Sequence, residues 1–348
     1  MTGDLFDLTR QLIDIPSVTG EEKNVGEFLV TLLEKQGYQV RKQDVAPDRF
    51  NVFAQTGASP RVVLSTHMDT VPPAIPARED AQKIYGRGAC DAKGIIAAQI
   101  VAATRLREDG INEIGLLFTV DEEQGSLGAQ VANEIQFDQP PEYLINGEPT
   151  DNKLALATKG SLRLNLQSTG RAAHSAYPEQ GESAIEKLLD ALSDVRRCAW
   201  PVDELLGETT CNIGVINGGT RANIVPDDAS ALLQLRLVSG LEPVKRILES
   251  TVAGRAEVKY LSAHEPVHLH KLAGFENCVV NFTTDIPYLT KWGIPLLLGP
   301  GSILQAHTEG EFVEKRALAD AVDLYARLVR TLLAEKSKAA ETVEGRSK

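Results

Sequence analysis

The sequence predicts an α/β protein in which a larger mixed-sheet domain carries a smaller inserted α+β domain. Runs of apolar residues, typical of strands buried on both faces, alternate with amphipathic helical patterns in the first half of the chain. From about residue 160 the pattern changes to short predicted strands in which apolar and polar residues alternate. The chain has 348 residues, more than a single hydrophobic core usually spans, so two domains are expected.

In the larger domain, leucine, isoleucine and valine recur at helical spacing near the N-terminus, and Ile15-Pro16 and Gly37 close two helices. The predicted helices cover residues 5–13, 25–33, 94–106 and 316–334. The predicted strands cover residues 38–45, 51–55, 61–66, 114–120, 143–146 and 293–301. Residues 336–348 form a polar tail that we expect to be disordered.

The inserted segment has the element order β-α-β-β-α-β, which is typical of a ferredoxin-like domain. Its first strand alternates, with Leu162, Leu164 and Leu166 on one face. The remaining elements are predicted at residues 184–195, 211–217, 229–238, 244–252 and 256–262. The predicted domains are therefore 1–159 with 266–348, and the insert 160–265.

Composition excludes several classes of function. The net charge of −12 argues against nucleic acid as a partner, because phosphate binding needs a basic face. No basic amphipathic helix for a membrane surface and no transmembrane run are found. The four cysteines lack CxxC spacing and indicate free thiols, and the acidic N-terminus is unlike a signal peptide. We expect a cytoplasmic protein.

Acids and histidines occur where the predicted strands pass into loops, the usual place for binding and catalytic groups. They are His67 and Asp69 in STHMDTVPP, Asp91 in GRGACDAKG, Glu122 and Glu123 in TVDEEQGSLGA, Glu148 in NGEPTD, and His307 in GPGSILQAHTEGE. Imidazole with carboxylate suits zinc, cobalt or manganese rather than calcium. The set is large enough for two ions that share one carboxylate.

Each motif alone also has a purely structural interpretation. Asp69 and Asp91 are suitable helix caps, and Glu123 suits a solvated turn near a helix N-terminus. A cluster of three acids from Asp121 to Glu123 would be relieved by a cation or by a raised pKa. His174, in the insert, is either a loop residue or a donor that stabilises an oxyanion. The agreement of several weak signals favours the metal site.

The motifs together, in this order, resemble the dinuclear zinc aminoacylase and exopeptidase family, which includes acetylornithine deacetylase, succinyl-diaminopimelate desuccinylase and carboxypeptidase G. The resemblance extends from IPSVTGEE (15–22) to AHTEGEFV (306–313). It implies a zinc-exopeptidase-like catalytic domain and an inserted ferredoxin-like lid and dimerisation domain. It also implies a homodimer and a cis peptide bond between Asp91 and Ala92.

The resemblance further implies a role for each matched residue. His67, Asp91 and Glu148 would hold one metal ion, and Asp91, Glu123 and His307 the other. Glu122 would be the general base and Asp69 would orient His67. His174 would reach the active site of the partner subunit in the dimer. Asn223, Arg236, Thr284 and Asp285 would contact the substrate, with Asp285 pairing an ammonium group and Arg236 a carboxylate.

The expected activity is metal-dependent hydrolysis of the amide bond of an N-acyl amino acid. The resemblance is strongest to acetylornithine deacetylase, which would place the protein in arginine biosynthesis. The alternatives are an acetyl-lysine deacetylase, a succinyl-diaminopimelate desuccinylase, and a dipeptidase or carboxypeptidase of the same family. A non-catalytic binding protein is disfavoured because every matched position is occupied by a residue suited to its role.

Overall fold

The computed structural model describes residues 2–57 and 59–344, and the chain divides into two compact units. Unit 1 comprises Met1–Leu156, Leu269–Cys278 and Thr284–Lys348. Unit 2 comprises Ala157–His268 and Val279–Thr283. The main segment of unit 2 therefore begins and ends within a few residues of the predicted bounds, 160 and 265. The short segment Val279–Thr283 also belongs to unit 2.

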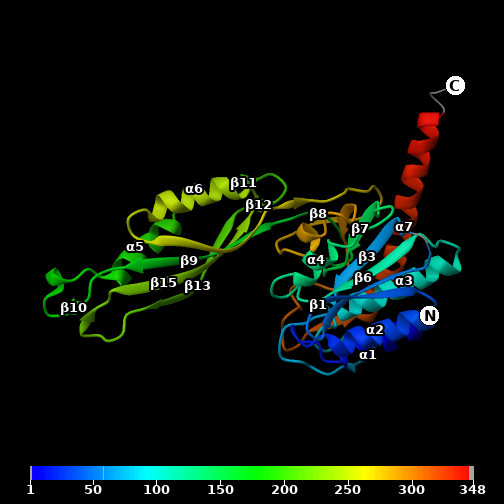
Figure 1. The fold of residues 1–348 in the computed structure, drawn as a ribbon, viewed down its shortest axis with the longest axis horizontal. Coiled ribbons are helices and arrows are strands. Elements are labelled where there is room, and N and C mark those ends of the chain that lie inside the picture. Colours follow the sequence, from blue (N-terminus) through cyan, green and yellow to red (C-terminus); the bar gives the residue numbers. More distant parts are fainter. Residues whose placement is uncertain (1, 58, 345–348) are drawn as a thin grey trace. The chain divides into compact units, whose positions relative to one another are not determined.

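A six-stranded mixed sheet forms the centre of unit 1 (Figure 1). Its strand order is β1-β2-β6-β3-β7-β19. Its strands are β1 (Gln39–Ala46), β2 (Arg49–Gln55), β3 (Val62–His67), β6 (Ile114–Thr119), β7 (Tyr143–Asn146) and β19 (Ile294–Leu297). The pairs β1–β2 and β2–β6 are antiparallel. The pairs β6–β3, β3–β7 and β7–β19 are parallel. The mixed α/β architecture expected from the sequence is confirmed.

Both faces of this sheet are covered, which explains the continuous apolar runs of its strands. Leu116 and Phe118 of β6 belong to the main core, together with residues of α1 (Thr2–Ile13), α2 (Lys23–Lys35), α3 (Lys93–Glu108) and α7 (Lys315–Glu344). Leu117 points to the other face, where it joins a second cluster with Ala129 of α4 (Leu127–Ala132) and with Trp292. Side chains alternate along a strand, so one strand contributes to both layers.

The structure adds short elements that the sequence pattern did not predict. One three-stranded sheet consists of β4 (Arg78–Glu79), β5 (Lys83–Tyr85) and β20 (Phe312–Glu314). Another consists of β8 (Leu154–Thr158), β17 (Val267–His268) and β18 (Asn277–Val280). Two to five residues are too few for a periodic signal.

The last helix, α7, continues to Glu344 and is longer than predicted. The expected end at Ala334 is therefore wrong. Alanine, glutamate and lysine dominate this extension, and these residues have a high intrinsic helix propensity. Residues 345–348 of the expected disordered tail lie outside the described residues. None of the helices in residues 2–57 and 59–344 has the length and apolar character to cross a membrane.

Unit 2 contains a four-stranded antiparallel sheet with the order β13-β15-β9-β16. Its elements, in chain order, are β9 (Gly160–Thr169), α5 (Ala184–Val195), β13 (Thr210–Gly218), β15 (Asp228–Leu237), α6 (Leu241–Val252) and β16 (Glu257–His264). The β-α-β-β-α-β order is the predicted one. The leucines of β9 pack with Leu188 of α5 and Leu248 of α6 to form a separate core.

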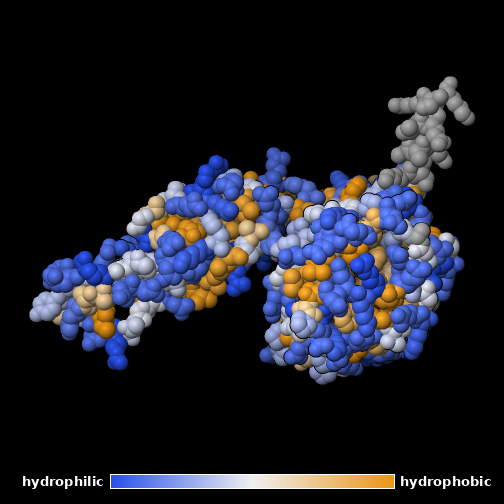
Figure 2. Space-filling model, in the orientation of Figure 1, coloured by the Kyte–Doolittle hydropathy of each residue, from blue (hydrophilic) through white to orange (hydrophobic). Residues whose placement is uncertain are grey.

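Shorter elements extend unit 2 beyond this sheet. They are β10 (Ala173–His174), η1 (Pro178–Gln180), β11 (Val202–Asp203), β12 (Gly207–Glu208) and β14 (Ile224–Val225). Strand β13 lies at an edge of the four-stranded sheet and exposes Val215 and Ile216, which are 45% and 52% accessible. Hydrophobic residues are visible on the surface of unit 2 in Figure 2.

Candidate metal centre

The carboxyl ends of three neighbouring parallel strands gather the predicted site residues. His67 is the last residue of β3 and pairs in register with Thr119, the last residue of β6. Glu122 and Glu123 follow β6 after a short turn, and Glu148 follows β7. Parallel strands of an open sheet present their carboxyl ends at one edge, where ligand sites usually form. Segments far apart in the sequence therefore meet at this edge.

Asp91 comes from a glycine-rich loop between β5 and α3. Gly88 has φ = +87°, a conformation that residues with a Cβ rarely adopt. A Cβ at Gly94 would lie 2.3 Å from the carbonyl oxygen of Ala89, so the loop folds back tightly on the start of the helix. The Asp91–Ala92 peptide bond is cis, as the family resemblance implied. Asp91 is buried, with 5% of its surface exposed.

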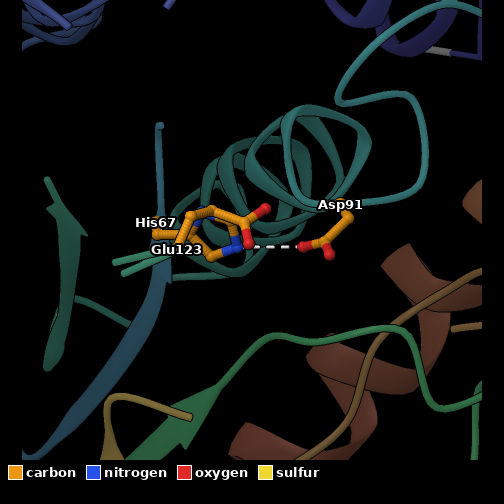
Figure 3. Close-up of side chains that lie close together, drawn as sticks. All are labelled: His67, Asp91 and Glu123. Carbon is orange, nitrogen blue, oxygen red and sulfur yellow. Dashed lines mark hydrogen bonds and ion pairs between the residues drawn. The ribbon is translucent and has the colours of Figure 1, made fainter. Parts of the chain in front are cut away.

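His67, Asp91 and Glu123 form one compact cluster (Figure 3). One ligand atom of each residue lies within 4.8 Å of the corresponding atoms of the other two. His67 Nε2 is 2.9 Å from Asp91 Oδ1. The cluster unites a strand end, the glycine-rich loop and the turn after β6.

His307 joins this cluster from the C-terminal part of unit 1. Its Nε2 lies 3.3 Å from Asp91 Oδ2 and 3.0 Å from Glu123 Oε1. The two oxygens of Asp91 thus face two different histidines, His67 and His307. This arrangement is suited to a carboxylate shared between two ions.

Charge is concentrated at the site. Hydrogen bonds with Asp91 and Glu123 raise the pKa of His307 to about 10. Burial raises the pKa of Glu122 well above its usual range, and the charge of Glu148 raises it further. Burial likewise raises the pKa of Glu148, against the opposing charge of His67. These carboxyl groups resist ionising together, and a cation relieves such repulsion.

The residues present fit a divalent metal. Glu148 Oε1 is buried and accepts no hydrogen bond from the described residues, as expected of an oxygen that has another partner. The donors are two imidazoles and three carboxylates, the set typical of zinc, cobalt or manganese. His67, Asp91, Glu123, Glu148 and His307 could hold one or two such ions.

Asp69 contacts three parts of the site. Its carbonyl oxygen lies 3.0 Å from His67 Nδ1, and its carboxylate Oδ1 lies 3.5 Å from the same nitrogen. The two carboxylate oxygens also accept the backbone N–H groups of Glu122 and Glu123, at 3.1 and 3.2 Å. Thr19 donates its hydroxyl hydrogen to Oδ2 at 2.9 Å. Asp69 therefore contacts both His67 and the turn that carries the two glutamates.

The structure adds supporting residues that the sequence interpretation missed. Arg49 donates to Glu22 at 2.6 and 2.8 Å and to Asp121 at 2.8 Å, next to the Glu122–Glu123 turn. Arg87 and Glu311 form a buried ion pair beside the Asp91 loop. Glu22, Arg87 and Glu311 lie within motifs that carry the family resemblance, but sequence patterns do not indicate which distant residue each contacts.

Three of the predicted residues belong to unit 2. His174 Nδ1 accepts the backbone N–H of Ala176 at 3.1 Å, so a neutral ring carries its proton on Nε2. The Asn223 carbonyl accepts the N–H of Ser175, which places the exposed Asn223 beside the His174 strand. Arg236 is partly buried on β15, and burial lowers its pKa. None of the ion pairs among the described residues involves Arg236.

Thr284 and Asp285 are buried in unit 1, with 4% and 1% of their surface exposed. Asp285 Oδ2 accepts the hydroxyl hydrogen of Thr119 at 2.7 Å, and burial raises its pKa to about 6. A carboxyl group that is only 1% exposed is poorly accessible to a substrate ammonium. The expected ammonium contact of Asp285 therefore has no support in its surroundings, which favour a role in holding the loop.

Comparisons with known proteins identify the family of the chain. The family model described as "Peptidase family M20/M25/M40" matches residues 63–331. A probable carboxypeptidase of Aspergillus niger is 38% identical over 364 residues, covering 92% of this chain and 88% of that protein. The chain therefore belongs to peptidase family M20/M25/M40, and it is a metal-dependent hydrolase.

Solved structures show the same fold at low sequence identity. A tripeptidase from Staphylococcus aureus superimposes with a TM-score of 0.79 at 22% identity, covering 94% of this chain and 97% of that one. A dinuclear metal-binding peptidase of the M20 family from Bacillus subtilis gives a TM-score of 0.71 at 15% identity, covering 96% and 98%. These likenesses show that the fold of the chain is shared with both structures.

Proposed function

We propose that the protein hydrolyses the amide bond that precedes a free α-carboxylate, as in a short peptide or an N-acyl amino acid. The observation that carries this proposal is the cluster of His67, Asp91, Glu123 and His307, with Glu122 on the adjacent turn. The similarity to a probable carboxypeptidase supports an exopeptidase reaction.

In the proposed mechanism, His67, Asp91 and Glu148 would hold one ion, and Asp91, Glu123 and His307 would hold the other. Bound divalent ions would polarise the scissile carbonyl and lower the pKa of water. Asp91 is suited to be the shared ligand because its two oxygens face different histidines. Zinc is the proposed metal, with cobalt or manganese as alternatives.

Glu122 is the proposed general base. It follows β6 after a short turn, next to Glu123, and burial raises its pKa, which brings a carboxylate closer to the basicity that proton transfer near neutral pH requires. Glu122 accepts a proton from the water that attacks the carbonyl carbon. After the C–N bond breaks, Glu122 gives that proton to the leaving nitrogen. Asp69 keeps Glu122 in place through its backbone N–H.

Unit 2 supplies the proposed substrate contacts. His174 offers an Nε2–H donor suited to a developing oxyanion. Arg236 is the proposed partner of the substrate carboxylate, because its guanidinium is partly buried and forms no ion pair within the described residues. Asn223 is the third proposed contact. We further propose that unit 2 is the lid and homodimer domain, since β13 presents an exposed apolar edge.

The identity of the acyl group distinguishes the candidates within the family. The expectation of N-acetylornithine rested on the resemblance to acetylornithine deacetylase, with Asp285 as a suggested partner of the substrate ammonium. The burial of Asp285 weakens that suggested contact. We therefore favour a broader exopeptidase, with acetylornithine deacetylase as the alternative. Initial rates on dipeptides, N-acetylornithine, N-acetyl-lysine and N-succinyl-diaminopimelate decide between them.

The same assay tests the proposed carboxylate contact. Each preferred substrate is compared with its C-terminal amide, and each rate is measured with chelator and after zinc is added back. We expect chelator-sensitive turnover that is lost for the amide. Arg236→Met should raise KM for the carboxylate substrate, whereas the exposed Arg163→Met on β9 should not. Equal rates on acid and amide would contradict the role of Arg236, and chelator-insensitive turnover would contradict the metal mechanism.

A further inference from the structure

The Asp91 loop contacts a buried carboxylate to which the proposed mechanism gives no role. Glu311 lies 220 residues further along the chain and is 1% exposed. Its Oε1 accepts three backbone N–H groups of the loop, from Gly88 at 2.9 Å, Cys90 at 3.0 Å and Asp91 at 3.2 Å. One side-chain oxygen therefore fixes the backbone on both sides of the turn that presents Asp91.

The other oxygen of Glu311 is held by Arg87. Arg87 Nη1 donates to Glu311 Oε2 at 2.6 Å, and Arg87 is 3% exposed. The same Nη1 donates to the carbonyl oxygen of Thr308 at 3.2 Å. Arg87 Nε donates to the carbonyl oxygen of Pro73 at 3.3 Å. The guanidinium thus connects the Asp91 loop with the residue that directly follows His307.

The arrangement links the two proposed ligands that come from loops rather than strand ends. Asp91 is the neighbour of Cys90, whose N–H Glu311 accepts, and His307 is the neighbour of Thr308. The backbone N–H of Gly86 also donates to the carbonyl oxygen of Glu311 at 3.0 Å, so the two segments are joined by main-chain and side-chain bonds. The 307–311 segment is therefore bonded directly to the backbone that presents Asp91.

Three convergent N–H groups would otherwise form a binding site for an external anion, since such groups are typical of phosphate and carboxylate sites. Here the protein's own Glu311 occupies them at hydrogen-bond distance. The group is buried and paired with Arg87, so a substrate carboxylate has no donor left to contact there. The feature is therefore suited to positioning and not to substrate binding.

We propose that Glu311 and Arg87 are positioning residues that fix Asp91 and His307 relative to each other and thereby set the metal affinity of the site. The proposal rests on the proposed metal site. Residues beyond the direct ligands hold ligand geometry in metalloproteins, and their loss typically weakens metal affinity about 10- to 100-fold. Glu311 and Arg87 contact the ligand-bearing backbone, so neither is assigned a catalytic role.

The test begins with Glu311→Gln, which keeps the size of the side chain. A carboxylate accepts hydrogen bonds with both oxygens, whereas an amide has one acceptor and one donor group. The amide can therefore serve either the three N–H groups or Arg87, but not both. We expect the metal dissociation constant, measured by competition with a chromophoric chelator, to rise about 10- to 100-fold.

The matched control is Glu314→Gln on β20, an exposed glutamate three residues further on, which should keep the wild-type affinity. The absorption spectrum of the cobalt-loaded protein provides a second readout, because it reports the geometry of the ligands. We expect an altered spectrum for Glu311→Gln and an unchanged one for Glu314→Gln. A purely structural role would lower unfolding stability without moving either readout in the folded fraction.

Removing one member of a buried ion pair leaves an unpaired charge and can prevent folding. The double variant Glu311→Gln/Arg87→Met removes both charges and keeps an acceptor for the loop N–H groups, but lacks the bond to the Thr308 carbonyl. We expect it to fold and still bind metal at least about tenfold more weakly. Wild-type affinity in the double variant would overturn the proposal.

The experiment also separates this proposal from the proposed function. Wild-type protein that binds no divalent ion would overturn the metal site and, with it, the role of Glu311. Wild-type protein that binds metal, together with Glu311→Gln of equal affinity and unchanged cobalt spectrum, would overturn the role of Glu311 alone.

Discussion

The carboxylate of Asp69 accepts the backbone N–H of Glu122, with 3.1 Å between Oδ1 and the nitrogen. The same side chain accepts the N–H of Glu123 and lies beside the Nδ1 nitrogen of His67. Asp69 is fully buried, and although burial opposes it, hydrogen bonds from His67 and other donors lower its pKa. An ionised acceptor therefore holds a proposed ligand and the proposed base in one arrangement.

We predict that Asp69→Asn lowers kcat/KM about 10- to 100-fold. An amide offers one acceptor where the carboxylate offers two, so its NH2 group would face the N–H of Glu122 or that of Glu123. Steady-state rates and metal content, measured on the same preparations, test this. Asp44→Asn is the control, because Asp44 is exposed on β1. Equal rates for both variants would show that Asp69 is dispensable.

We predict opposite results for the two adjacent glutamates. Glu122→Gln should keep the bound metal and lower kcat about 10²- to 10⁴-fold, the usual effect of losing a general base. Glu123→Gln should weaken metal binding, because Glu123 lies in the cluster with His67 and Asp91. Metal content by elemental analysis and single-turnover rates separate the two effects. If Glu122→Gln lost the metal instead, the two assignments would have to be exchanged.

The sequence predicts the parts of the site that lie on strand ends better than the parts that support them. His67, Glu123 and Glu148 follow apolar runs, and a parallel sheet brings such ends together whatever the loops do. Glu311 contacts the Asp91 loop although the two residues are 220 positions apart in the chain, and no local sequence pattern predicts such a contact. The burial of Asp285 was missed for a similar reason, since its partner Thr119 lies 166 residues away.

The short strands and the last helix show the same limit of sequence-based prediction. Strand β20 (Phe312–Glu314) pairs with β5 (Lys83–Tyr85), which lies far away along the chain. Strands β4, β5 and β20 are each too short to show a period of their own. The extension of α7 was underestimated because the prediction relied on an apolar stripe, whereas residues 335–344 are rich in intrinsically helical residues. Periodicity predicts packed elements, and it does not predict elements that depend on propensity or on distant partners.

We predict that Asp285→Asn stabilises the metal-free protein at neutral pH. Burial raises the pKa of Asp285 from 3.8 to about 6, against the opposing hydrogen bond from Thr119. Because the folded-state pKa lies above the unfolded value, the contribution of Asp285 to the free energy of unfolding is fully present below about pH 4. This contribution is lost as the pH rises through about 6. A shift of about two pKa units corresponds to about 3 kcal/mol.

Urea unfolding of chelator-treated protein between pH 4 and pH 8 measures this effect. The amide of Asp285→Asn still accepts from Thr119 but cannot ionise, so its advantage over wild type should grow with pH and vanish near pH 4. Asp44→Asn should give no such pH-dependent difference. A variant that is less stable than wild type at pH 8 would indicate that the ionised carboxylate has a favourable partner.

We predict that Arg49→Met destabilises unit 1 by about 3–5 kcal/mol, the usual result of removing one member of a buried charge network. The Glu22 side chain is fully buried and that of Asp121 is 13% exposed, and both accept hydrogen bonds from Arg49. Without the guanidinium, two neighbouring carboxylates lose their cation. Arg49→Lys should give an intermediate loss, because an ammonium cannot form the two-nitrogen contact with Glu22.

The same variant should also affect the site, because Asp121 begins the turn that carries Glu122 and Glu123. Asp121 Oδ2 and its carbonyl oxygen accept the N–H groups of Leu127 and of Gly125 and Ser126, so the turn depends on the position of this one residue. Urea unfolding and metal affinity, measured beside the exposed Arg41→Met as control, test both effects. If Arg49→Met lost stability and kept wild-type metal affinity, the network would support the fold without positioning the turn.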